Sequence, residues 1–197
     1  MSHTPATPAV PEQPAVPEHY LFDGVLQAEE LLWIYHKLLA VPSWSLARYS
    51  YNSQPALRPF MSFPGLEVET EGKPKDEFLS GYFNGLVYRI RALAMSRHGL
   101  KLPPRILRIH LGAKASTSKT EFHVDLEDEN AWTILGFLNP EWNSADGGEF
   151  YLKDHRIEYR SGRFILFRSN TPHNGGFVTN PALTYWRIAV NVLLGAP

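Results

Sequence analysis

The chain has 197 residues and a formal net charge of −1, with 44% hydrophobic and 20% charged residues. This size suits one domain with a sizeable buried core, and the scattered arginines give no clustered basic face that would support nucleic-acid binding. The absence of cysteine excludes disulfides, thiolate metal sites and cysteine nucleophiles within the chain.

The N-terminal residues 1–18 are rich in proline and alanine. Proline blocks regular helix and favours extended conformers, so we expect a disordered tail followed by one domain over residues 19–197. No apolar run approaches the roughly 20 residues of a membrane-spanning helix, and no secretory signal is visible. Together with the lack of cysteine, which fits a reducing cytosol, this favours a cytoplasmic protein.

Apolar residues at helical spacing predict two helices in the first half of the chain. Residues 27–40 repeat apolar side chains at i, i+3, i+4 and i+7 from Leu31 to Leu38, and Pro42 ends the pattern. Residues 77–98 carry a second apolar stripe of the same period. Both segments are therefore expected to pack one face against a core.

The second half changes to the alternating pattern of strands. Its short apolar segments are separated by Gly, Pro, Asn and Asp, which is typical of antiparallel strands. They cover residues 105–112, 120–126, 131–138, 148–153, 162–168 and 185–194. Two helices followed by many strands predict an α+β, mainly β domain, in which the helices pack outside a β-sandwich or jelly roll.

Two candidate metal ligands, His123 and Asp125, are separated by one residue in a predicted strand. Successive strand side chains point to opposite faces, so these two share a face. His173 follows several strands later, and a sheet that folds back would bring it beside the pair. Two histidines and one carboxylate on iron(II) leave positions open for a co-substrate and dioxygen, although each residue alone is more often an ordinary surface or hydrogen-bonded side chain.

The segment 185–194 has two distinct faces. Trp186, Ile188 and the following alternate residues form an apolar wall for the helices, whereas Arg187 and Asn191 point into the sandwich. A buried arginine needs an anionic partner. A bound dicarboxylate supplies one with bidentate geometry, and a carboxylate of the protein itself is the alternative.

Six strings between residues 105 and 194 together resemble the iron(II)/2-oxoglutarate-dependent oxygenases, particularly the prolyl-4-hydroxylase-like branch. Members commonly carry a histidine–aspartate pair, a Leu-Asn-x-x-Trp string, a Gly-Gly-Glu turn, a Gly-Arg strand start and a distal histidine in this order. The matching strings are His123-Val124-Asp125, Phe137-Leu138-Asn139-Pro140-Glu141-Trp142, Gly147-Gly148-Glu149-Phe150, Gly162-Arg163-Phe164-Ile165-Leu166-Phe167, Pro172-His173 and Arg187-Ile188-Ala189. The resemblance covers about half of the chain and implies a double-stranded β-helix, which is a jelly roll.

The resemblance also implies roles for individual residues. His123, Asp125 and His173 would be the iron ligands, and Arg187 would hold the distal carboxylate of 2-oxoglutarate. Thr133 falls where the family often has a threonine near that co-substrate.

Two further residues are candidates for the co-substrate pocket. His110 stands where the family often has a tyrosine, so it is expected either to hydrogen-bond the co-substrate, to lie beside the metal, or to be an ordinary sheet histidine. Asn191 is expected to line the pocket. Phe137 replaces another frequent tyrosine, which removes a hydroxyl donor.

The function that the resemblance implies is a dioxygenase that uses iron(II), 2-oxoglutarate and O2, with ascorbate as an optional addition. It would hydroxylate or otherwise oxidise an unactivated C–H bond and release succinate and CO2. A small-molecule substrate is expected because no appended peptide-binding domain is visible. A protein or peptide hydroxylase of the prolyl type is the main alternative, and a cupin-like metal-binding protein without keto-acid chemistry is the second.

Charge does not decide between substrates. The acidic run at residues 125–129 is expected to be a solvated loop, and attraction of a cationic substrate is the alternative. The basic residues that flank the preceding strand, Arg105, Arg108 and Lys114, would favour an anionic substrate instead.

Overall fold

The computed structural model describes residues 18–41, 45–46, 60–62, 77–114, 121–180, 182 and 186–196, so the predicted tail lies almost entirely outside the described residues. In chain order the elements are β1 (His19–Phe22), α1 (Ala28–Ala40), β2 (Ser45–Leu46), β3 (Phe60–Ser62), α2 (Glu77–His98), β4 (Arg105–Lys114), β5 (Trp132–Phe137), the 3-10 helix η1 (Ser144–Asp146), β6 (Phe150–Leu152), β7 (His155–Ile157), β8 (Phe164–Arg168), β9 (His173–Gly175) and β10 (Arg187–Gly195).

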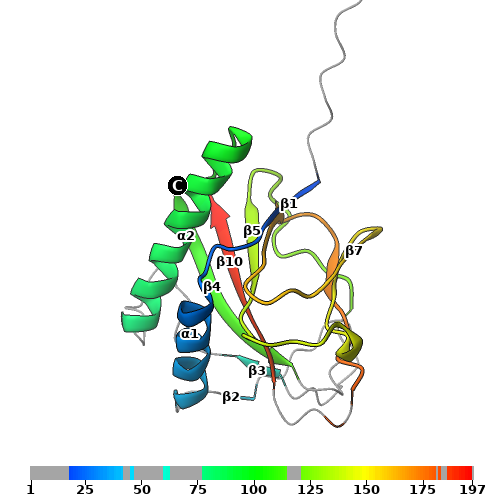
Figure 1. The fold of residues 1–197 in the computed structure, drawn as a ribbon. Helices are drawn as coiled ribbons and strands as arrows, with labels where there is room; N and C mark the ends of the chain where they lie inside the picture. Colours follow the sequence, from blue (N-terminus) through cyan, green and yellow to red (C-terminus); the bar gives the residue numbers. More distant parts are fainter. Residues whose placement is uncertain are drawn as a thin grey trace, which may run out of the picture.

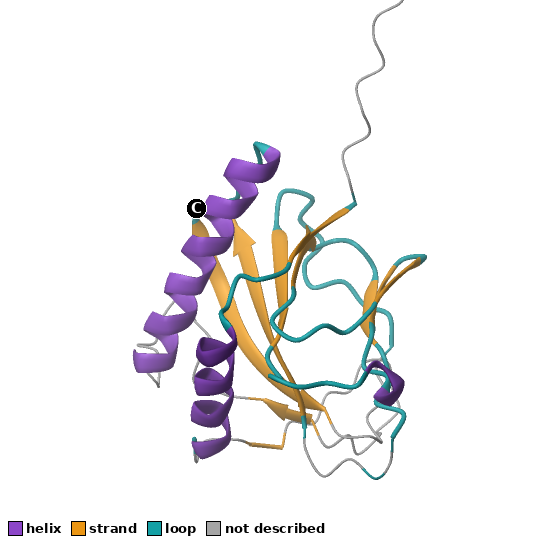
Figure 2. Ribbon diagram, in the orientation of Figure 1, coloured by secondary structure: helices purple, strands orange, loops and turns teal. Residues whose placement is uncertain are grey.

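The strands form two antiparallel sheets. The larger sheet has the order β1-β8-β5-β10-β4-β3-β2, and the smaller has the order β7-β6-β9. The non-sequential order reflects the folding back that a jelly roll requires. Helices α1 and α2 lie on one side of the large sheet and the small sheet lies on the other (Figures 1 and 2). This confirms the predicted mainly β fold with supporting N-terminal helices.

The two predicted helices are confirmed because each buries its apolar stripe. Ile34 and Leu38 of α1 and Phe83 of α2 are fully buried, and they belong to the core beneath the helices. The helices are joined at their outer edges, where Glu30 accepts a hydrogen bond from Tyr82 at 3.0 Å and pairs with Arg89. The helical layer thus covers one face of the large sheet.

The two faces of β10 are also confirmed. Ile188, Val190, Val192 and Leu194 lie in the core beneath the helices. A second core of buried, mostly aromatic and aliphatic residues lies between the two sheets. Its members are Leu135, Phe137, Phe150, Leu152, Ile157, Tyr159, Ile165, Phe167 and Ala189. Because residues two apart share a face, Arg187 and Asn191 point toward this inner space.

The prediction of a strand over residues 120–126 is wrong for the described part, residues 121–126. Within residues 121–126 the structure has a single bridge, between His123 and His173. Asp125 instead donates its N–H to the carbonyl of Ser169 at 3.0 Å, in the connection between β8 and β9. Strand β9 itself was not predicted, because its three residues lie in a turn-rich string that has no apolar alternation.

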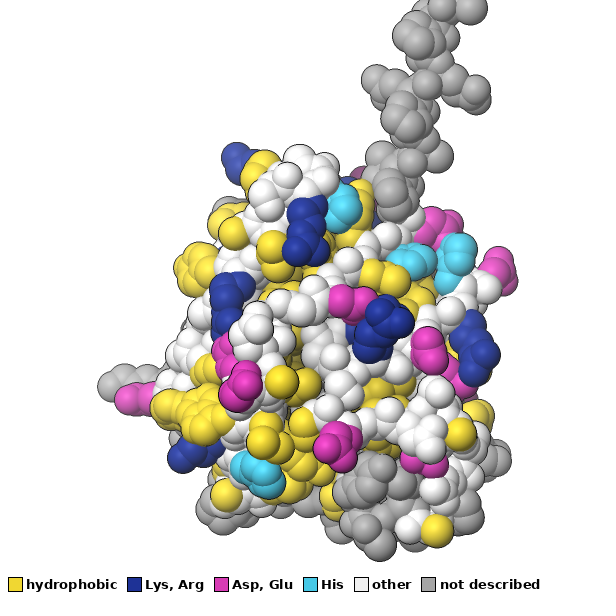
Figure 3. Space-filling view, in the orientation of Figure 1, with side chains coloured by type: hydrophobic (Ala, Val, Ile, Leu, Met, Phe, Trp, Pro, Cys, Tyr) yellow, Lys and Arg dark blue, Asp and Glu magenta, His cyan; other side chains and the backbone are white. Residues whose placement is uncertain are grey.

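Neither described helix has the length and apolar character needed to cross a membrane. On the face shown in Figure 3, basic and acidic side chains are interspersed with apolar ones and do not gather by sign.

Candidate active site

The three candidate metal ligands converge on one point. One ligand atom each of His123, Asp125 and His173 lies within 4.8 Å of the others. Nε2 of His173 is 3.6 Å from Oδ2 of Asp125, and the two imidazole centroids are 4.4 Å apart. Metal–ligand bonds of about 2.1 Å allow one ion to lie between atoms at such separations. The residues present therefore fit an ion held by two histidines and one carboxylate.

Both imidazoles are oriented by backbone carbonyls. Nδ1 of His123 lies 3.0 Å from the carbonyl oxygen of Glu121, and Nδ1 of His173 lies 2.9 Å from that of Thr171. When Nδ1–H donates to a carbonyl, Nε2 is left as the metal-binding nitrogen. Burial lowers the pKa of His173, which favours the neutral imidazole that a metal requires.

The carboxylate of Asp125 is held by three polar side chains. Its Oδ2 accepts from Thr133 Oγ1 at 2.8 Å and Asn191 Nδ2 at 3.1 Å, and its Oδ1 accepts from Arg108 at 3.1 Å. Burial alone would raise the pKa of Asp125, but His173 and these hydrogen-bond partners outweigh it and hold the pKa below its usual value. The group is therefore ionised and ready to bind a cation.

These contacts show where two predicted co-substrate residues lie. Thr133 and Asn191 both donate hydrogen bonds to the Asp125 carboxylate, and Thr133 also lies 3.0 Å from Ser169 Oγ. Their contact with a co-substrate stays a prediction. Arg108, which sequence reasoning had considered only for substrate charge, also belongs to this cluster. The sequence signal for Arg108 is strand alternation, which places it on the same inner face of β4 as His110, the residue opposite Asn191 of β10.

His110 lies on β4 directly opposite Asn191 of β10. Burial, and secondarily the charge of Arg108, lowers the pKa of His110 to about 4, against the opposing effect of Asp125. The imidazole is therefore neutral at physiological pH and adds no positive charge to the site. Its role toward a metal or co-substrate stays a prediction.

The low pKa of His110 makes stability depend on pH. Between 6.5 and about 4 the unfolded chain takes up a proton at this histidine and the folded chain does not, so stability present above 6.5 is lost as pH falls. In metal-free protein we expect this group to lower the free energy of unfolding by about 3 kcal/mol across that pH range. The free energy of unfolding, measured with urea at several pH values, should therefore fall less steeply with decreasing pH for His110→Gln than for the wild type. The exposed His36→Gln is the control, and equal slopes for both variants would contradict the assignment.

Arg187 is buried at the other end of the inner face. Its Nε donates to the carbonyl of Gly148 at 2.8 Å, and its guanidinium carbon lies 5.1 Å from the ring centre of Phe137 and 5.4 Å from that of Tyr159. Gly148 has φ of +80°, and a Cβ there would be 3.0 Å from the Arg187 side chain. The Gly-Gly-Glu turn thus leaves room for this arginine.

The Leu-Asn-x-x-Trp string fixes the backbone on both sides of Arg187. Asn139 donates to the carbonyl of Trp186 at 2.7 Å and accepts from the N–H of Ile188 at 2.7 Å. Its Oδ1 also accepts from the hydroxyl of Tyr159 at 3.0 Å. One buried amide therefore locks the start of β10 to the end of β5 and sets the position of Arg187.

Asn139→Ala should lower the free energy of unfolding by about 3 kcal/mol, because it leaves several buried polar groups without partners. Chemical denaturation measures this change directly. The exposed Asn130→Ala should change stability by less than about 0.5 kcal/mol. Equal stabilities of the two variants would show that the buried amide does not hold the strand.

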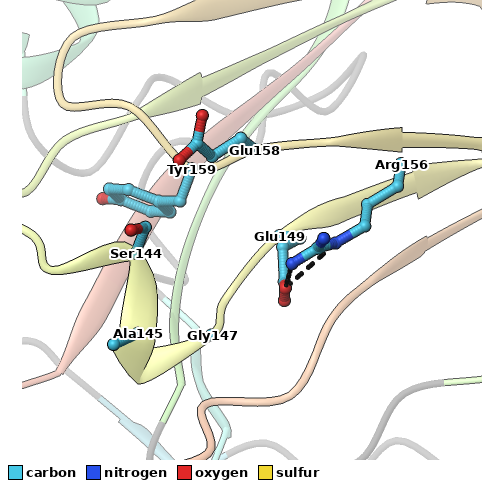
Figure 4. Close-up of a pocket in the computed structure, with 7 residues that line it drawn as sticks. All are labelled: Ser144, Ala145, Gly147, Glu149, Arg156, Glu158 and Tyr159. Carbon is cyan, nitrogen blue, oxygen red and sulfur yellow. Dashed lines mark hydrogen bonds and ion pairs between the residues drawn. The ribbon is translucent and has the colours of Figure 1, made fainter.

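A hollow of about 340 Å³ opens near the edge of the small sheet, beside Tyr159, and no triad residue lines it (Figure 4). Its lining residues are Ser144, Ala145, Gly147, Glu149, Arg156, Glu158 and Tyr159. Glu149 and Arg156 form an ion pair along its wall. This hollow is therefore a feature separate from the metal-ligand cluster.

Comparison with known families assigns this geometry to a class. Residues 109–193 match the family described as the 2OG-Fe(II) oxygenase superfamily, and this segment contains all three triad residues and Arg187. No curated protein matches the sequence significantly.

Several solved structures share the fold at low identity. A Trichoplax adhaerens prolyl hydroxylase, solved with a hypoxia inducible factor peptide fragment, is 20% identical with a TM-score of 0.59, over 89% of this chain and 82% of that one. A Pseudomonas putida prolyl-4-hydroxylase is 16% identical with a TM-score of 0.62, over 91% and 93%. The α-ketoglutarate-dependent epimerase SnoN from nogalamycin biosynthesis is 16% identical with a TM-score of 0.60, over 89% and 76%.

Residues 109–193 of this chain belong to the 2OG-Fe(II) oxygenase superfamily, and the triad geometry agrees with that match. The predicted enzyme class and the predicted use of iron(II) and 2-oxoglutarate, as in the superfamily, are thereby confirmed.

Proposed function

We propose that this oxygenase hydroxylates or otherwise oxidises an unactivated C–H bond of a small molecule, with His123, Asp125 and His173 as the iron(II) ligands. The observation that carries the proposal is the convergence of these three side chains in the fold of the superfamily. When bound, iron(II) with 2-oxoglutarate and O2 supplies the oxidising chemistry, and the keto acid leaves as succinate and CO2.

The protein's own residues position the reactants and exclude water. The two imidazoles, with Nδ1 held by backbone carbonyls, present Nε2 to the ion, and Asp125 supplies its negative charge. These three residues would hold the ion and leave coordination positions for reactants. Arg187 would hold the distal carboxylate of the keto acid by a charge-assisted pair.

The likeness to an epimerase from nogalamycin biosynthesis supports a small-molecule substrate. The likeness to two prolyl hydroxylases, one bound to a peptide, supports the alternative of a peptide hydroxylase. All three neighbours are too distant in sequence to carry substrate identity.

The test has two stages. Purified protein is incubated aerobically with iron(II) and 2-oxoglutarate, and succinate is quantified against a reaction without iron. Active protein is then given a metabolite extract or a proline-rich peptide library, and mass spectrometry seeks a gain of about 16 Da, the mass of one added oxygen atom. A gain on metabolites alone supports the proposal. A gain on peptides alone contradicts the small-molecule assignment, and iron-independent succinate release contradicts the triad.

A further inference from the structure

Arg108 contacts the metal-ligand cluster from strand β4, and only part of its hydrogen-bonding capacity is used. Its Nη2 lies 3.1 Å from Oδ1 of Asp125 and 3.4 Å from Oδ1 of Asn191. Its Nε is buried and has no hydrogen-bond partner among the residues that the structure describes. A guanidinium carries several N–H donors on three nitrogens, so Arg108 retains donors for a bound group.

Arg108 lies far along the inner face from Arg187. In the register of β4 and β10, which run side by side (Figure 1), Arg187 is paired with Lys114, and Leu193 is paired with Arg108. The two pairs are separated by roughly 20 Å along the strands. Arg108 also contacts the Asp125 carboxylate directly. Its place is therefore distinct from the end of the site that the proposed function gives to the keto acid's distal carboxylate.

The side chain of Arg108 is more open to solvent than the groups around it. It is 33% exposed, against 6% for the side chain of Asp125. His173 and Arg187 are buried, and each is only 3% exposed. A molecule that arrives from solvent can therefore reach the guanidinium of Arg108 beside the metal-binding carboxylate.

The acidic run that follows Asp125 does not neutralise this cation. Glu127, Asp128 and Glu129 are exposed, and the carboxylate of Asp128 accepts a hydrogen bond from the N–H of Asn130 at 2.8 Å. Charges that face solvent are screened by salt. Of the two opposing charge signals in the sequence, the basic one therefore includes a residue in contact with the cluster.

The loaded site leaves the charge of Arg108 without compensation. In the proposed function, a divalent ion and a doubly charged keto acid cancel each other in charge, and so do Asp125 and Arg187. The positive charge of Arg108 then remains beside the place of reaction. A partly desolvated cation is stabilised by a nearby anion, and a guanidinium can give a carboxylate, phosphate or sulfate more than one hydrogen bond.

We propose that the substrate carries a negatively charged group and that Arg108 binds this group on the solvent side of the metal site. The inference rests on the proposed function and gives its substrate a chemical class. It makes Arg108 a specificity-determining residue in addition to a hydrogen-bond partner of Asp125. A cationic substrate would meet an uncompensated like charge at this point, so the same residue selects against it.

The first experiment measures binding without turnover. Wild-type protein loaded with manganese(II) and 2-oxoglutarate is mixed with a metabolite extract in the absence of oxygen. Compounds that are retained with the protein on ultrafiltration are identified by mass spectrometry. The retained compounds should be anions at neutral pH. Retention of cations alone, or of neutral compounds alone, would overturn the inference.

The second experiment repeats the retention with variants. Arg108→Met should weaken binding of the retained compounds about tenfold, the cost of losing a hydrogen bond to a charged group. Arg108→Lys keeps the charge and should recover part of that loss. Arg105→Met, which changes an exposed arginine on the same strand, is the matched control and should bind as the wild type does.

A second measurement separates contact with the substrate from an effect through the metal ligand. Because Arg108 also contacts Asp125, the manganese affinity of each variant is determined by electron paramagnetic resonance, and retention is compared with every variant saturated in manganese. The loss in Arg108→Met should persist at saturation. Full recovery there would show that the arginine acts only through Asp125, which would contradict the proposal.

The outcomes also distinguish this inference from the function beneath it. If the wild-type protein retains no metabolite, acidic and basic peptide libraries replace the extract. Retention of acidic peptides alone supports the charge inference and contradicts the small-molecule assignment, whereas retention of basic peptides alone contradicts both. If nothing is retained, the inference falls, and the proposed function falls with it only if no iron-dependent succinate is released.

Discussion

Asp125→Ala is expected to abolish both iron binding and iron-dependent succinate release. Asp125 is the only carboxylate in the triad, and its buried oxygens are held in place by Thr133, Asn191 and Arg108. Loss of an outer partner of a metal ligand costs about tenfold to a hundredfold in affinity, so loss of the ligand itself should exceed a hundredfold. Metal content after dialysis and succinate yield measure the two losses.

A matched acidic residue lies two positions further on. Glu127 is exposed, so Glu127→Ala should keep full metal content and turnover. Turnover by Asp125→Ala at the rate of the Glu127 variant would remove this carboxylate from the metal site. Circular dichroism of both variants excludes unfolding as the cause of any loss.

The second large effect is expected at Arg187. Arg187→Met should raise the 2-oxoglutarate concentration needed for half-maximal turnover roughly 30- to 4,000-fold. This factor corresponds to the cost of about 2–5 kcal/mol for breaking a desolvated charge-assisted pair. The maximal rate at saturating 2-oxoglutarate should change much less, since the triad is untouched. Succinate release against 2-oxoglutarate concentration gives both quantities.

The same change should not destabilise the protein in the absence of co-substrate. Burial lowers the pKa of Arg187, and its Nη2 has no hydrogen bond in the described part of the chain, so methionine removes a desolvation cost. The loss of the hydrogen bond to the Gly148 carbonyl offsets that gain, so thermal unfolding without keto acid should give a melting temperature close to that of the wild type. The exposed Arg97→Met is the control for both measurements. A large destabilisation together with an unchanged co-substrate requirement would show that Arg187 is purely structural.

The sequence predicted the fold well wherever one face of an element is apolar. The periodicity of apolar residues predicted the positions of helices α1 and α2 and strands β5, β8 and β10. It did so because each of these elements buries one apolar face, and the spacing of the buried residues differs between helices and strands. The short strand β9 and the irregular course of residues 121–126 could not be predicted this way. Their backbone hydrogen bonds go to residues distant in sequence, such as Ser169, and leave no local period.

The sequence predicted the three candidate metal ligands, but it did not predict the side chains that hydrogen-bond to them. The triad was found because its residue types match a metal's preferences, and the three side chains do converge. The hydrogen bonds from Thr133, Asn191 and Arg108 to Asp125 were not foreseen, because they depend on the register between β4, β5 and β10. The position of Lys114 opposite Arg187 depends on the same register.

The measurement that tests the central claim most directly is an anaerobic titration of metal-free protein with iron(II), with and without 2-oxoglutarate. The account predicts one ion per chain, tighter iron binding when the keto acid is present, and no stoichiometric binding by a variant with alanine at both His123 and His173. Undiminished stoichiometric binding by that double variant would contradict a site built from these residues.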